Sequence, residues 1–115
     1  MTDLDRSGGA WSETPPDWRN LIYEVFNPDY SVGVACDRNG MIVGMHLGDE
    51  VWDSTDSWLA DEVVRVARLA YLKSQVGRRA EMLYNGALPQ FADSLGLITE
   101  SEYRYREKAE FGRDL

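Results

Sequence analysis

The chain has 115 residues, 43% of them hydrophobic, and a formal net charge of −8. This length suits a single domain, and the hydrophobic content excludes wholesale disorder. The acidic charge is unfavourable for nucleic acid, which is bound through cations that neutralise phosphates, and for an anionic membrane surface.

Residues 1–19 predict a flexible N-terminal arm, because they contain Gly8-Gly9 and Pro15-Pro16 and show no hydrophobic period. They lack the basic and apolar regions of a signal peptide, and no apolar run in the chain is long enough to span a bilayer. We therefore expect a cytoplasmic protein, with one domain over residues 20–115. Two tryptophans in the arm, Trp11 and Trp18, predict docking on this domain in preference to reaching a partner.

Three strand-like segments follow, at 20–27, 30–37 and 41–48. Asn39-Gly40 between the second and third predicts a hairpin turn, so the segments form a three-stranded antiparallel meander. In the third segment, strict alternation assigns one face to Met41, Val43, Met45 and Leu47, and the other to Ile42, Gly44 and His46.

The second segment has one bulky face, which a helix is expected to cover, and one face of small residues. Small side chains let another surface approach closely, so this face predicts contact with solvent or with a second copy of the chain. The candidate interface residues here are Ser31, Gly33 and Ala35.

A long helix is predicted from the N-cap Thr55 to Tyr84, where Asn85-Gly86 ends it. Gly77 inside it marks a close crossing or a bend. Apolar residues occupy two stripes of this helix, whereas one stripe is enough to pack against a sheet of three strands. We expect the second stripe to pack on the C-terminal helices, on a second subunit, or on both; its candidate interface residues are Leu69, Leu72, Val76 and Leu83.

Two shorter helices complete the predicted α+β fold. Pro89 opens the first, which ends at Gly96. Thr99 and Glu102 form a capping box for the second, which Gly112 closes and which we expect to be half buried.

No catalytic, metal-binding or cofactor-binding motif is present, so we predict a protein that is not an enzyme and needs no cofactor. His46 is the only histidine and Cys36 the only cysteine, which leaves no cluster with zinc-ligand spacing. We expect Cys36 to be a small buried hydrophobe rather than a reactive thiol.

About half of the chain, residues 22–47 and 51–76, resembles mycobacterial ESX (type VII) secretion-associated proteins of the EspD/EspH kind. More remotely, three strands followed by a long helix are similar to the YbaB/EbfC nucleoid-protein fold, which dimerises. The residues that carry the first resemblance are Asn27-Pro28, Gly40, Thr55, Leu59, Ala60, Asp61, Glu62, Val63, Ala67, Leu69, Ala70 and Lys73.

The first resemblance implies a non-enzymatic accessory protein of ESX secretion that holds or stabilises a secretion protein or substrate. The YbaB-like fold and the second apolar stripe of the long helix add the expectation that it forms homodimers. Tyr103 and Glu107 fit the Y-x-x-x-[D/E] motif of type VII substrates, which makes export by such a system a second location beside the cytoplasm. The remoter resemblance implies an alternative function, a nucleoid-associated DNA-binding protein. A small enzyme with chemistry supplied by a substrate or a metal is the third hypothesis, which no motif favours.

Overall fold

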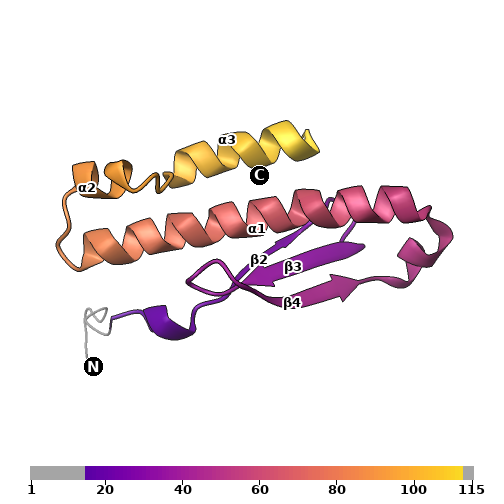
Figure 1. Ribbon diagram of the computed structural model, residues 1–115, viewed down its shortest axis with the longest axis horizontal. Helices are drawn as coiled ribbons and strands as arrows, with labels where there is room; N and C mark the ends of the chain where they lie inside the picture. Colours follow the sequence, from indigo (N-terminus) through magenta and orange to yellow (C-terminus); the bar gives the residue numbers. More distant parts are fainter. Residues whose placement is uncertain (1–14, 113–115) are drawn as a thin grey trace, which may run out of the picture.

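The computed structural model describes residues 15–112 and confirms an α+β fold: a three-stranded antiparallel sheet followed by a long helix and two shorter ones (Figure 1). The strands are β2 (Tyr23–Phe26), β3 (Val32–Cys36) and β4 (Ile42–Leu47), in the order β2-β3-β4. The helices are α1 (Asp56–Tyr84), α2 (Pro89–Ser94) and α3 (Glu100–Phe111). Short 3₁₀ turns, η1 (Trp18–Asn20) and η2 (Asp49–Asp53), precede β2 and α1.

All three strands begin later than the sequence predicts, β4 by one residue and the other two by two or three, where local hydrogen bonds hold the preceding residues in turns. The Asn20 side chain donates to Asp17 across η1, so β2 begins at Tyr23 rather than at residue 20. Tyr30 has a φ of 62° and the Ser31 amide donates to Asp29, so β3 begins at Val32. Of the predicted arm, the structure describes only residues 15–19, and Trp11 lies outside the described residues. The Trp18 ring packs against Tyr84, with 5.8 Å between ring centroids.

The helix boundaries follow the local capping signals closely. Thr55 Oγ1 accepts a hydrogen bond from the Trp58 amide at 3.0 Å, and Thr99 Oγ1 accepts one from the Glu102 amide at 3.1 Å. Gly112 ends α3 in the left-handed conformation, with a φ of 68°. These contacts satisfy backbone groups that the helix itself leaves without partners.

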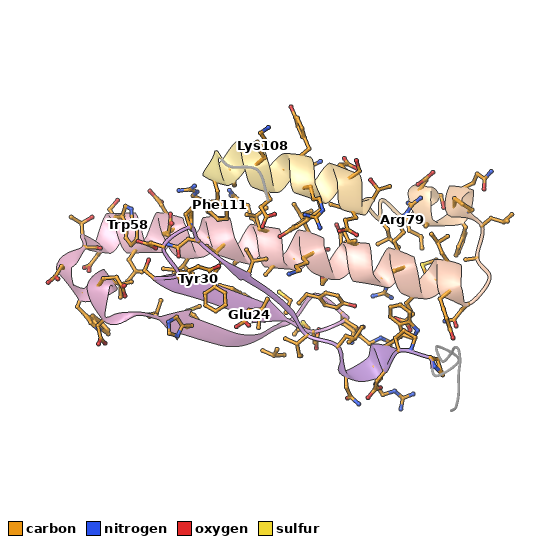
Figure 2. All side chains as sticks on the ribbon, turned by 180° about the vertical axis from the view of Figure 1, so that it is seen from behind. Glu24, Tyr30, Trp58, Arg79, Lys108 and Phe111 are labelled. Atoms are coloured by element: carbon orange, nitrogen blue, oxygen red, sulfur yellow. The ribbon has the colours of Figure 1, made fainter. Side chains whose placement is uncertain are left out.

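The core lies between the sheet and α1, and Figure 1 shows α3 on the opposite side of α1 from the sheet. Val32, Val34 and Cys36 of β3 are buried against α1, as the alternation predicts. Phe111 lies where α1 and α3 meet (Figure 2), and Tyr103 of α3 belongs to the same buried cluster. The C-terminal helix therefore covers part of the second apolar stripe of α1.

Gly77 marks a close crossing rather than a bend. A Cβ atom placed on it would lie 2.1 Å from the Tyr23 hydroxyl oxygen and 2.2 Å from ring atom Cζ. Since ordinary carbon contacts are about 3.5–4.0 Å apart, glycine is what allows the β2 tyrosine to lie on the helix.

Candidate protein-binding surface

Strand β4 is an apolar edge strand whose residues are all exposed. Five apolar side chains at or next to it keep between 36% and 64% of their surface accessible: Met41, Ile42, Val43, Met45 and Leu47. The strand contains neither a charged residue nor a proline, which are devices that protect free edges from pairing. Within residues 15–112, no strand pairs with its outer side.

A shift in strand pairing gathers the larger β4 side chains on the side of the sheet that faces α1. Val34 pairs with Met45 and Ala35 with Gly44, but Cys36 pairs with Ile42, so Val43 is an extra residue. Residues directly opposite each other in an antiparallel pair lie on the same face. Ile42 therefore joins Met45 and Leu47 on the α1 side, and the strict alternation predicted from the sequence is wrong at this point.

A groove of about 500 Å³ lies between Ile42, at the start of β4, and the side of α1 next to it, and we call it the β4 groove. Tyr71 and Gly40 both line the groove, and the Tyr71 ring lies over Gly40, where an added Cβ would come within 2.7 Å of it. Buried Cys36 also lines the groove, and desolvation raises the pKa of its thiol, which keeps the thiol protonated. The other residues that shape the groove are Ile42, Val64, Ala67, Arg68, Leu72 and Arg106.

The predicted interface residues at and just before β3 are buried within the chain. Ser31 is buried, and its hydroxyl donates to Asp29 and accepts from Asn27. Gly33 is covered by the ring of Phe26, which comes within 2.5 Å of where a Cβ would be. Ala35 is 8% exposed. These three residues offer little surface to a second copy.

The predicted interface residues of α1 are divided between the core and the surface. Leu69 is 2% exposed, and Leu72 and Val76 are half-buried against the core. Leu83, at the far end of α1, is 37% exposed. Four of the seven predicted interface residues, namely Ser31, Gly33, Ala35 and Leu69, are thus buried within one copy, and the homodimer itself stays a prediction.

Two residues that carry the sequence resemblance, Asn27 and Glu62, are 35 positions apart and in direct contact. Asn27 Nδ2 donates to Glu62 Oε2 at 2.8 Å, while Asn27 Oδ1 accepts from the Val32 amide at 3.0 Å. Glu62 also pairs with Arg65 at 2.9 Å. Both Asn27 and Glu62 are buried, so this network fixes the β2–β3 turn to α1. Neighbouring Asp29 accepts from the Ser31 hydroxyl and amide, which lowers the pKa of its carboxyl.

The candidate secretion motif lies on α3 with its two ends in different environments. Tyr103 is buried, and its hydroxyl lies 3.4 Å from Glu107 Oε2. Desolvation is the main cause that raises the pKa of this hydroxyl, and the Glu107 charge adds to it. Tyr103 is thus part of the hydrophobic core. Export by a type VII system stays a prediction.

The basic side chains of α1 are mostly engaged within the chain. Arg65 pairs with Glu62 and Glu110 and lies over the Phe111 ring. Arg79 lies between α1 and α2 (Figure 2), where it binds Asp93 and the Leu97 carbonyl. Lys73 Nζ donates to the Glu24 carbonyl. Apart from Glu62, which lies three residues before Arg65 on α1, these partners lie outside α1, so the sequence alone did not reveal them.

Within residues 15–112, no group of three or more His, Cys, Asp or Glu side chains is arranged to hold a metal ion. His46 lies on the face of the sheet away from α1, with its ring 5.8 Å from that of Phe26. Among the helices that the structure describes, none combines the length and apolar character needed to cross a membrane.

Comparison with known proteins gave no relative: the chain matches no family model, no curated protein and no solved structure. The ESX and YbaB resemblances therefore stay predictions from the sequence.

Proposed function

We propose that this chain is a non-enzymatic accessory protein that works by binding another protein, and that the β4 groove is its binding surface. The observation that carries this proposal is the exposure of β4, an uncharged apolar edge strand next to an apolar groove. Association with type VII secretion and a cytoplasmic location are parts of the proposal that rest on the sequence resemblance alone.

Physical chemistry supports a protein partner at this surface. Monomeric proteins rarely expose large contiguous apolar patches, and such patches commonly mark interaction sites. A fully buried Val, Leu, Ile or Met side chain contributes about 1.5–3 kcal/mol relative to exposure. Covering five half-exposed side chains of this kind would therefore supply several kcal/mol toward binding.

A photo-crosslinking experiment in the organism that encodes the chain tests the proposal. A photoreactive residue replaces Ile42 in the full-length chain, and the matched control replaces Ile22, which precedes β2 at the other edge of the sheet. The two side chains are 55% and 53% exposed. We expect a discrete crosslinked protein from position 42 and none from position 22. Equal yields from both positions would contradict the proposal.

The identity of the crosslinked protein tests the secretion part separately. A component or substrate of a type VII system would support the whole proposal. A reproducible partner outside such systems would support protein binding at β4 and refute the link to secretion.

A further inference from the structure

Helix α1 covers two of the three strands, which leaves the packing of the sheet incomplete. A helix with its side chains is about 10–12 Å across, whereas neighbouring strands are about 4.8 Å apart, so one helix covers about two strands. Figure 1 shows α1 on the side of β2 and β3, with β4 as the strand furthest from it. The α1-facing side chains of β4 are accordingly exposed: Ile42 by 55%, Met45 by 53% and Leu47 by 36%.

We propose that the β4 groove receives one amphipathic helix of a partner protein, lying beside α1 and carrying acidic residues next to its apolar stripe. This inference rests on the proposed function and names the class of partner that the groove fits. A second helix beside α1 would complete a two-layer arrangement in which two helices cover three strands.

The positive charge of two arginines at the groove indicates that the partner helix carries acidic residues. Arg68 and Arg106 both line it, and Arg68 is exposed on α1. Arg106 pairs with Glu102 at 3.3 Å, and both of these side chains are about half exposed. Carboxylates on the docked helix would therefore meet arginine side chains at the edge of an apolar groove, which favours an acidic partner over a basic one.

Among residues 15–112, the helices do not supply such a stripe to a second copy. Those of sufficient length, α1 and α3, already use buried apolar residues in their own core, among them Val66, Leu69 and Tyr103. Helix α2 has only six residues. The groove is thus better suited to a different protein.

An added strand is a poorer occupant than a helix. It would pair with the outer side of β4 and lie in the plane of the sheet. The α1-facing side of Ile42, Met45 and Leu47 would then remain uncovered, because these side chains project out of that plane.

Synthetic peptides and the full chain test the inference directly. The probe is a fluorescent peptide with leucines at i, i+3, i+4 and i+7 and flanking glutamates, about 18 residues long because shorter isolated helices are marginal in water. The comparison peptides have lysines in place of the glutamates, the same composition in scrambled order, or an extended strand-like alternation. Fluorescence anisotropy at increasing concentrations of the chain measures each affinity.

We expect the glutamate-flanked helix to bind about tenfold or more tightly than the lysine-flanked and scrambled peptides. Ile42→Lys should weaken binding about tenfold or more, whereas the matched control Ile22→Lys should not change it. Arg68→Glu should make the chain prefer the lysine-flanked peptide over the glutamate-flanked one. The control Arg19→Glu, on η1, should leave the preference for the glutamate-flanked peptide unchanged. Circular dichroism and thermal unfolding verify that each variant is folded.

Three results would overturn the inference: preference for the strand-like peptide, loss of binding in both isoleucine variants, or sedimentation showing a dimer that Ile42→Lys dissociates. The proposed function has its own test, because crosslinking from position 42 in cells would support protein binding even if no helical peptide bound.

Discussion

At the scale of single residues, the contact between Gly77 and Tyr23 limits which side chains α1 can carry. In an exposed helix, replacing glycine by alanine stabilises by about 1 kcal/mol. Here the new methyl group would lie within 2.3 Å of three Tyr23 atoms, so we expect Gly77→Ala to lower the free energy of unfolding by about 1–3 kcal/mol. Denaturant unfolding measures this change.

Gly44→Ala is the matched control for this prediction, because its nearest neighbour would be the Ala35 Cβ at 3.7 Å, an ordinary contact. We expect it to change stability by no more than about 0.5 kcal/mol. If Gly77→Ala stabilised the chain instead, the Tyr23 ring would be free to move aside and the close crossing would not constrain the fold.

Tyr103 makes stability sensitive to alkaline pH. Burial raises the pKa of its hydroxyl above the ordinary value, so the folded chain holds this proton more tightly than the unfolded chain. This contribution is fully present below the ordinary tyrosine pKa of about 10. It is lost as the pH rises through the higher pKa of the folded state.

We therefore expect Tyr103→Phe to lose less stability than the parent chain between pH 9.5 and 11.5. Urea unfolding at several pH values measures the slope. Tyr105→Phe is the control, since Tyr105 is 75% exposed on the same helix. Parallel curves for Tyr103→Phe and the parent chain would show that this hydroxyl titrates alike in both states.

At the scale of elements, caps and turns could be predicted from the sequence because their signals are local. Thr55, Thr99 and Gly112 act on backbone groups within four residues, and the structure confirms each. Strand starts were less predictable, since Asp17 and Asp29 hold short turns that compete with strand residues of high propensity. The extra residue at Val43 has no local signal, because it depends on how β3 and β4 pair.

Elements are also joined by the Asn27–Glu62 contact, and a double-mutant cycle measures its strength. We expect Asn27→Ala and Glu62→Ala to be separately destabilising. Asn27→Ala leaves the buried Glu62 Oε2 and the Val32 amide without this partner, and Glu62→Ala leaves Asn27 Nδ2 with Ser31 Oγ as its remaining acceptor. Their coupling energy should be about 1–3 kcal/mol. The exposed Glu102–Arg106 pair is the control, with an expected coupling below about 0.5 kcal/mol. Equal couplings would mean that the buried contact does not fix the β2–β3 turn.

At the scale of the whole molecule, the numbers of helices and strands already indicated that part of the sheet would stay uncovered. One long helix and three strands were predictable, and one helix covers about two strands. Which strand would stay uncovered was not predictable, because it depends on the path of α1 over the sheet. The predicted interface comprised Ser31, Gly33 and Ala35 together with Leu69, Leu72, Val76 and Leu83 of the helix. The structure buries the first three and Leu69, whereas it exposes Ile42, Val43 and Met45.

The charge of the whole molecule is unfavourable for the nucleoid alternative, which stays an untested prediction. A protein gains affinity for DNA by neutralising phosphates with cations, and this chain carries 20 acidic against 12 basic residues. Arg65, Arg79 and Lys73 on α1 are moreover engaged by partners within the chain. We expect duplex DNA to bind with a Kd weaker than about 10⁻⁴ M at about 150 mM salt, measured by fluorescence anisotropy, with weak binding only near 20 mM. Binding that persists at the higher salt and is lost in Arg68→Glu would contradict this expectation. It would also turn the arginines beside the β4 groove into a phosphate-binding surface, a role that a groove for an acidic helix does not share.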